Sequence, residues 1–178
     1  SIAELNKPKT PAVTDTLNLA AAAADGHLDS SHQALLSGEF GAFAAAATGN
    51  EQNTVLENDV VKITFSNKGG QPASVQLKEY KTYDGAPLML LQGTFNRLSV
   101  EVPASLTKVL NSADLFFTPG QQQELAGGVK SLSYRLNTSN PASYLEFIYS
   151  VKPGSYVVNY TIHAVGLQGL LPANQQYL

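Results

Sequence analysis

The side chains with the most obvious catalytic potential in this chain are three histidines, His27, His32 and His163. His27 and His32 are five residues apart, a spacing that does not bring both imidazoles to one helical face as a four-residue spacing would. We therefore expect no metal site at this pair. His163 alternates with Asn159 and Thr161 and is expected to be a surface histidine. The alternative role for His163 is that of a general base in a sugar-binding cleft.

The carboxylates and glycines give no catalytic pattern either. The scattered carboxylates are expected to be solvated surface charges: Glu57, Asp59, Glu79, Asp84, Glu101, Asp114, Glu124 and Glu146. Gly69-Gly70 and Gly127-Gly128 lack the strand–GxGxxG–helix setting of a phosphate-binding loop, and we interpret them as turn glycines. The sequence therefore predicts a non-catalytic protein with no cofactor-binding residue and no metal site.

Tyrosines offer the remaining chemical feature. Tyr80 and Tyr83 lie in a polar segment that follows a predicted strand, where an exposed aromatic ring can serve recognition. The alternative is that both rings pack over the edge of the sheet. Tyr149, Tyr156 and Tyr160, by contrast, fall on predicted core faces. Tyr80 and Tyr83 are thus the candidate interaction surface.

Composition narrows the class of protein. The chain has 178 residues, which suits one domain with a substantial core. Only 14% of its residues are charged and the formal net charge is -3, so the clustered basic residues of a nucleic-acid-binding protein are missing. There is no cysteine, which rules out a disulfide framework and a thiolate metal site. The sequence also lacks the 18 or so consecutive apolar residues of a membrane-spanning helix.

From Thr54 onward, short alternating segments separated by turn residues predict an antiparallel sandwich. We predict strands at Thr54–Glu57, Val60–Ser66, Ala73–Leu77, Leu88–Gln92, Leu98–Val102, Asp114–Thr118, Lys130–Asn137, Tyr144–Val151 and Tyr156–Ala164. Pro153 and Gly154 suit the two central positions of a tight turn between the last two strands. Gln121 to Glu124, after another Pro-Gly turn, is expected to cap a loop or a short helix.

The first 53 residues have a different character. Residues 1–53 are rich in alanine and polar side chains and have weak apolar periodicity, which is typical of a linker with short helical pieces. Helices are expected at Leu17–Ala24 and at His32–Leu36, with the second ended by Gly38. The predicted organisation is thus a juxtamembrane segment over 1–53 and a β-sandwich domain over 54–178.

Two blocks of the sandwich region resemble a known family. The first joins Ser66-Asn67-Lys68-Gly69-Gly70 to the Lys/Tyr-rich segment Leu77 to Tyr83. The second runs from Phe147 to Tyr160 and has the form of a strand, a Lys-x-Gly turn and a Tyr-Val-x-Asn-x strand. Together they resemble the periplasmic domain of YidC-type membrane protein insertases, in the form found in the Bacteroides group.

The resemblance implies a β-supersandwich, the fold also used by galactose mutarotase-like and carbohydrate-binding proteins. It implies a non-catalytic domain, on the periplasmic side of the bacterial inner membrane, of a protein that inserts and folds membrane proteins alone or with the Sec translocon. The implied partners are Sec auxiliary subunits and nascent membrane proteins. Family members continue with further strands, so the domain is expected to be incomplete at Leu178. A sugar-binding or mutarotase-like module remains the alternative, because fold alone does not fix function.

Overall fold

A computed structural model of the chain describes residues 30–92, 98–105 and 107–167. All the described strands belong to one compact unit, Leu35–Leu178, and the other unit, Ser1–Ala34, is described only from Ser30 onward. The predicted helix at Leu17–Ala24 lies outside the described residues. The elements are α2 (Ser30–Phe40), η1 (Gly41–Ala46), β1 (Asn53–Glu57), β2 (Val61–Ser66), β3 (Gln71–Lys81), β4 (Pro87–Gln92), β5 (Glu101–Pro103), β6 (Val109–Asn111), η2 (Ser112–Asp114), β7 (Thr118–Pro119), β8 (Gln123–Leu125), η3 (Ala126–Gly128), β9 (Val129–Asn137), β10 (Tyr144–Val151) and β11 (Val158–Val165).

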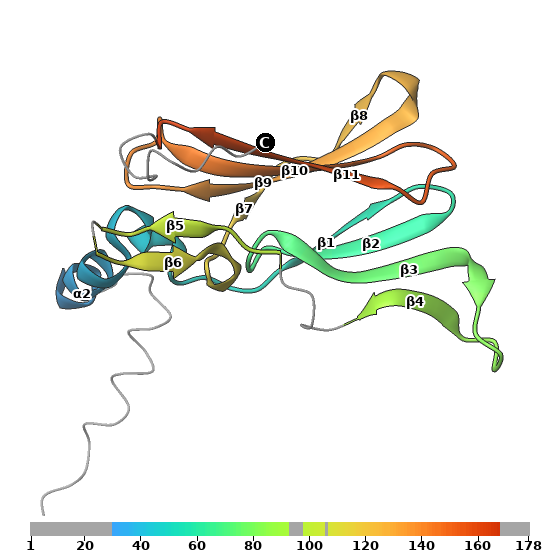
Figure 1. Cartoon of the computed structure of the whole chain (residues 1–178), viewed down its shortest axis with the longest axis horizontal. Helices are drawn as coiled ribbons and strands as arrows, with labels where there is room; N and C mark the ends of the chain where they lie inside the picture. Colours follow the sequence, from blue (N-terminus) through green and yellow to red (C-terminus); the bar gives the residue numbers. More distant parts are fainter. Residues whose placement is uncertain (1–29, 93–97, 106, 168–178) are drawn as a thin grey trace, which may run out of the picture. The chain divides into compact units, whose positions relative to one another are not determined.

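The described strands form three antiparallel sheets (Figure 1). The first has the order β1-β2-β3-β4, the second has the order β11-β10-β9-β7 with β8 also paired to β9, and the third is the β5-β6 pair. Every pairing in them is antiparallel. The expected all-β antiparallel architecture is confirmed. None of the helices within the described ranges is both long and apolar enough to cross a membrane.

The core lies between the first and second sheets. Phe65 of β2 places its ring 4.5 Å from the ring of Tyr149 on β10 and 6.0 Å from that of Tyr134 on β9, measured between centroids. All three rings are buried, and burial of each is worth about 1.5–3 kcal/mol. The Tyr149 hydroxyl also donates a 2.7 Å hydrogen bond to the carbonyl of Gly70, which lies directly before β3. The two sheets are therefore joined by both packing and a buried hydrogen bond, as a β-sandwich requires.

The segment before the first strand contributes to the same core. Phe43 and Ala46 of η1 are buried in the hydrophobic cluster formed by the two sheets. The Ala46 carbonyl accepts a 2.8 Å hydrogen bond from the amide of Phe116. Helix α2 begins at Ser30 and continues through Gly38 to Phe40, four residues beyond the predicted end at Leu36. The division at residue 54 stays a prediction, but core residues precede it.

The strand predicted at Asp114–Thr118 is wrong over most of its length. The Asn111 side chain accepts a 2.9 Å hydrogen bond from the Ala113 amide and starts the 3-10 turn η2 instead. The following backbone amides bond outside any strand: Phe116 to the carbonyl of Ala46 at the end of η1, and Phe117 to the Asn67 carbonyl in the turn after β2. Only the short β7 forms, because the hydrogen-bond partners of this segment are not those of a ladder.

Other elements also differ from the sequence prediction. Strand β3 continues to Lys81, four residues beyond the predicted end at Leu77, so Tyr80 lies within the strand and not in a segment after it. Strand β6 is an additional strand that the sequence does not predict. Gln121 to Glu124 does not form a loop cap or short helix; instead Gln123 begins β8, which forms a hairpin with β9 through Gly127 and Gly128, both at positive φ. The predicted strand at Leu98–Val102 starts only at Glu101. Val100 bonds to Ser112 through the serine hydroxyl as well as its backbone, so a regular ladder does not reach it.

Candidate functional site

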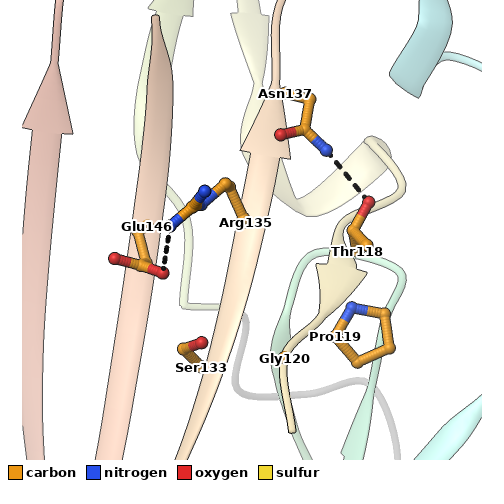
Figure 2. A pocket seen from close by; sticks show the side chains of 7 residues that line it. All are labelled: Thr118, Pro119, Gly120, Ser133, Arg135, Asn137 and Glu146. Carbon is orange, nitrogen blue, oxygen red and sulfur yellow. Dashed lines mark hydrogen bonds and ion pairs between the residues drawn. The ribbon is translucent and has the colours of Figure 1, made fainter. Parts of the chain in front are cut away.

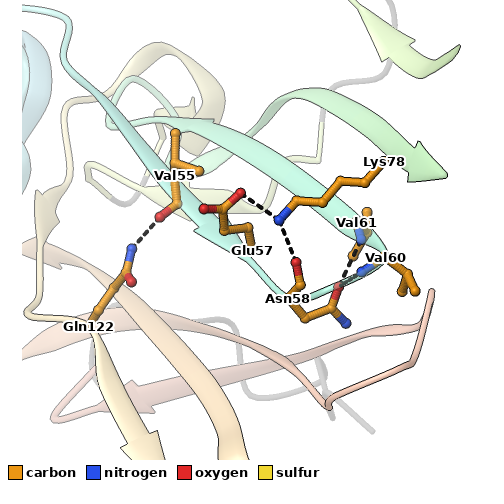
Figure 3. Close-up of polar contacts among 7 residues, drawn as sticks. All are labelled: Val55, Glu57, Asn58, Val60, Val61, Lys78 and Gln122. Carbon is orange, nitrogen blue, oxygen red and sulfur yellow. Dashed lines mark hydrogen bonds and ion pairs between the residues drawn. The ribbon is translucent and has the colours of Figure 1, made fainter. Parts of the chain in front are cut away.

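A buried asparagine, Asn58, joins the turn between β1 and β2 to the loop between β10 and β11. Its side-chain oxygen accepts hydrogen bonds from the amides of Val60 (3.0 Å) and Val61 (2.8 Å) (Figure 3). Its side-chain nitrogen donates to the carbonyls of Lys152 (2.6 Å) and Ser155 (2.7 Å). Asn58 is 8% exposed. All four side-chain bonds therefore form at a site where water competes poorly.

The same turn binds the side chain of Lys78, a residue of the neighbouring strand β3. The Lys78 ammonium donates a 2.6 Å hydrogen bond to the Asn58 carbonyl and forms a 2.9 Å ion pair with Glu57 (Figure 3). The hydrogen bond from Lys78 is the main reason that the pKa of Glu57 lies below its ordinary value. On the other side of Glu57, the Gln122 side chain donates to the Val55 carbonyl. We call the contacts of Asn58 and Lys78 the Asn58 clamp.

The Asn58 clamp sets two tyrosines beside one another on the surface. Lys78 precedes Glu79 and Tyr80 in β3, and Ser155 precedes Tyr156 in the loop before β11. The rings of Tyr80 and Tyr156 lie 6.2 Å apart at an angle of 56°, and the Tyr156 hydroxyl donates a 3.0 Å hydrogen bond to the Glu79 carboxylate. The two tyrosines remain 51% and 43% exposed. We call Glu79, Tyr80 and Tyr156 the tyrosine surface.

The electrostatics of the tyrosine surface are acidic. Desolvation and the hydrogen bond to the Glu79 carboxylate raise the pKa of Tyr156 to about 12. The phenol of Tyr156 is therefore protonated near neutral pH and serves as a donor to Glu79. The surface thus combines one negative charge with two partly exposed aromatic faces.

Tyr83 takes a separate position. It is fully exposed at the turn that joins β3 to β4. That turn is fixed by the Thr82 amide, which donates 2.8 Å to the Ala86 carbonyl, and by the Gly85 amide, which donates 2.9 Å to the Thr82 carbonyl. Of the two tyrosines that the sequence singles out, Tyr80 belongs to the tyrosine surface and Tyr83 lies at the hairpin tip.

Sequence reasoning missed Tyr156. Its alternation with Val158 and Tyr160 predicts a core position, but β11 begins only at Val158, opposite Val151. Residues 152–157 form the connecting loop, so the alternation does not extend to Tyr156. The sequence did contain one indication: the turn at Pro153-Gly154 ends at Ser155, so residues after it could still belong to the loop.

The glycines and proline predicted at turns occupy tight places in the fold. Gly69 and Gly70 both have positive φ, and a Cβ on Gly70 would lie 3.0 Å from the Phe117 ring and from the Cβ of Tyr134. Pro153 and Gly154 are the central residues of a turn closed by a 3.3 Å hydrogen bond between the Ser155 amide and the Lys152 carbonyl. Gly154 again has positive φ, which an L-residue rarely adopts.

A shallow polar pocket of about 410 Å³ lies on the other sheet, over β7, β9 and β10 (Figure 2). Arg135 forms a 3.1 Å ion pair with Glu146, and its guanidinium carbon lies 3.9 Å from the centre of the Tyr144 ring. The Asn137 side chain donates a 3.1 Å hydrogen bond to the Thr118 hydroxyl. The charged groups of this pocket are thus already paired with one another.

The histidines do not assemble a catalytic site in the part of the chain that the structure describes. His163 is exposed on β11 and pairs in register with Glu146, whose carboxylate is engaged by Arg135. His32 is exposed on α2, and His27 lies outside the described residues. Among the described residues, no group of three His, Cys, Asp or Glu side chains is placed to hold a metal ion.

The fold is an antiparallel β-sandwich domain. At one end of its first and second sheets it presents two tyrosines beside the carboxylate of Glu79. The chain belongs to the YidC periplasmic domain family, whose family model matches residues 53–177. The family resemblance predicted from the two sequence blocks is thereby confirmed. No solved structure matches the chain.

Relatives with curated names agree with this assignment. The chain is 38% identical over 143 residues to the membrane protein insertase YidC of Parabacteroides distasonis, a match that covers 80% of this chain and 22% of that protein. It is 36% identical over 130 residues to the same-named protein of Phocaeicola vulgatus, covering 73% of this chain and 20% of that protein. For Cytophaga hutchinsonii the identity is 32% over 162 residues, covering 91% and 25%. The chain thus spans 20% to 25% of the length of these relatives.

Proposed function

We propose that this chain is the non-catalytic periplasmic domain of a bacterial inner-membrane insertase, which inserts and folds membrane proteins alone or with the Sec translocon. Support comes from the family match over residues 53–177 and from relatives named as membrane protein insertases. In this proposal the domain contributes docking or structural support rather than insertion chemistry. Sec auxiliary subunits and nascent membrane proteins are the partners we propose.

The observation that carries a docking role is the tyrosine surface. Tyr80 lies on a strand of the first sheet and Tyr156 in a loop of the second, yet the Asn58 clamp holds them in contact while leaving about half of each side chain exposed. Tyrosine is enriched at protein–protein contacts because its ring buries a large area with few rotatable bonds and its hydroxyl still reaches a polar partner. A fixed and exposed pair of tyrosines is therefore suited to contact with another protein.

Site-specific photocrosslinking in the full-length protein in membranes tests this role. A crosslinking amino acid at Tyr80 or Tyr156 is expected to capture the same Sec subunit or nascent membrane protein. The control position is Val109 on β6, which is 58% exposed and belongs to a different sheet. Equal capture at Val109, or no capture at either tyrosine, would contradict docking at this surface.

The proposal that the domain is non-catalytic is supported by the pairing of the groups that a sugar-directed site would need. Glu146, the carboxylate opposite His163, accepts a hydrogen bond from Arg135 and is not free to act with the histidine. The family match also favours the insertase over a mutarotase-like or carbohydrate-binding module. A glycan array followed by isothermal titration tests the alternative: micromolar sugar binding that His163→Ala abolishes would overturn the proposal.

A further inference from the structure

Several aromatic rings of this domain are paired with cations from its own chain. The Lys68 ammonium lies 5.8 Å from the centre of the Phe116 ring, and the Lys108 ammonium lies 5.9 Å from that of Phe40. The guanidinium carbon of Arg135 lies 3.9 Å from the centre of the Tyr144 ring. Each ring thus presents its negative face to a positive charge, an arrangement that is favourable up to about 6 Å.

Tyr80 and Tyr156 differ from these rings in their partners. Within the described ranges of the chain, the cation–π contacts involve Phe116, Phe40 and Tyr144 and do not include either member of the tyrosine pair. The neighbouring charge is instead the carboxylate of Glu79, which accepts the hydrogen bond from Tyr156. The tyrosine surface therefore has the aromatic faces and the anion of a cation-binding site.

The cation of Lys78 is already paired with other groups of the chain. Lys78 directly precedes Glu79, but its ammonium is held by the Glu57 carboxylate at 2.9 Å and the Asn58 carbonyl at 2.6 Å. Moving it toward the tyrosines would break both contacts and loosen the Asn58 clamp. An incoming cation thus meets no competitor from this side chain.

We propose that Glu79, Tyr80 and Tyr156 bind a positively charged side chain, arginine or lysine, of a partner polypeptide. The rings lie 6.2 Å apart at 56° and are 51% and 43% exposed, so a cation at this surface can approach an exposed aromatic face while it also contacts the Glu79 carboxylate. Arginine fits best because its planar guanidinium stacks on an aromatic face and still donates hydrogen bonds to a carboxylate. This inference rests on the docking role proposed above and specifies the chemistry of the partner.

The test uses the 178-residue chain labelled with ¹⁵N and a short, capped peptide of alternating arginine and serine. A second peptide carries citrulline in place of arginine, which keeps the shape of the side chain and removes its charge. The arginine peptide is expected to shift the NMR resonances of Tyr80 and Tyr156 more than those of Tyr83 and to bind less tightly as salt is raised. The citrulline peptide is expected to bind at least about fivefold more weakly.

Matched variants separate the ring faces from the charge. Tyr80→Leu and Glu79→Gln are each expected to weaken arginine-peptide binding by about two- to fivefold, since each removes one exposed cation contact. Tyr83→Leu and Glu124→Gln, which alter an exposed ring and an exposed carboxylate elsewhere, are expected to leave binding unchanged. Tyr156→Phe keeps its ring and is expected to bind within about twofold of the parent chain. Thermal melting of each variant verifies that it is folded.

Equal binding of the arginine and citrulline peptides would overturn the inference, as would no binding of either or an equal loss in the control variants. If the arginine preference is refuted in any of these ways but photocrosslinks still form at Tyr80 in the full-length protein, the tyrosine surface docks a partner of other chemistry and the proposed function stands. If the arginine preference is found but crosslinks are absent, the site binds cations and the docking role is refuted.

Discussion

Replacement of Asn58 by alanine should destabilise the domain more than replacement of any exposed asparagine. The side chain accepts hydrogen bonds from Val60 and Val61 and donates to the carbonyls of Lys152 and Ser155. Alanine removes all four bonds and leaves the two amides and the Ser155 carbonyl to find other partners, while the Lys152 carbonyl keeps its bond from the Ser155 amide. Because Asn58 is only 8% exposed, water replaces these partners incompletely.

The size of the effect follows from the number and setting of these bonds. A hydrogen bond contributes about 0.5–1.5 kcal/mol net, and a buried polar group left without a partner costs about 1–3 kcal/mol. Three of the four groups that Asn58 bonds lie in loops and the fourth, the Val61 amide, is at the first residue of β2, so part of the loss is recovered by hydration. We expect Asn58→Ala to lower the free energy of unfolding by about 2–4 kcal/mol.

Urea unfolding followed by circular dichroism measures this change at pH 7. Asn159→Ala, on the exposed face of β11, is the matched control and is expected to change the free energy of unfolding by less than about 0.5 kcal/mol. Asn58→Asp separates hydrogen bonding from volume, because it keeps an acceptor for Val60 and Val61 but points a carboxylate at the carbonyls of Lys152 and Ser155. That variant should be at least as unstable as Asn58→Ala at pH 7.

Protonation of the new carboxyl restores one donor, so the deficit of Asn58→Asp relative to the parent chain should shrink as the pH is lowered toward about 5. If Asn58→Ala unfolds within about 0.5 kcal/mol of the parent chain, the clamp contributes little and the reasoning about how the tyrosine surface is positioned is wrong.

Four other substitutions test the packing and the charges. Gly70→Ala should cost about 2 kcal/mol or more in urea unfolding, because its φ is +57° and a Cβ would lie 3.0 Å from its neighbours. Tyr149→Phe should cost about 1–2 kcal/mol by leaving the buried Gly70 carbonyl without its donor, whereas Tyr160→Phe should be nearly neutral, since that hydroxyl has no partner in the described part of the chain. Lys78→Met should flatten the loss of stability in acid. The pKa of Glu57 is lowered in the folded state, so its contribution is present above its ordinary value of 4.5 and is lost as the pH falls; unfolding at pH 6 and pH 3 would refute this if the variant lost as much stability as the parent.

The parts of the fold that could be read from the sequence are those in which local pattern and burial coincide. Residues 145, 147, 149 and 151 are Leu, Phe, Tyr and Val at every second position, and they are the buried residues of β10. Strand β8 has no such pattern: it forms because Gly127 and Gly128 turn the chain back along β9, a signal that lies outside the strand. The core role of Phe43 depends on contacts with sheets that are distant in sequence, which periodicity does not encode.

In the candidate site, too, one residue could be predicted from local sequence and its partner could not. Tyr80 could be singled out because a tyrosine in a polar segment is expected to be exposed, and it is 51% exposed. Its pairing with Tyr156 could not, because that pairing depends on hydrogen bonds from Asn58 to Lys152 and Ser155, 94 and 97 residues along the chain. The strand register that leaves Tyr156 in a loop is likewise set by the pairing of β10 with β11 and not by local alternation.

The position of the tyrosine surface makes partner binding dependent on the way the sandwich closes. Tyr80 is carried by the first sheet and Tyr156 by a loop of the second, and Asn58 bonds to the neighbours of both, Lys78 and Ser155. A ligand that contacts both rings therefore binds only when the two sheets are held together at this end. By linkage, such a ligand stabilises the closed sandwich by about 2.7 kcal/mol at a hundred times its dissociation constant, an amount comparable to the contribution expected of Asn58 itself. The contacts of Asn58 hold the two sheets together at this end and thus also determine how tightly the tyrosine surface binds its partner. They do so although none of the four groups bonded by the Asn58 side chain belongs to the tyrosine surface.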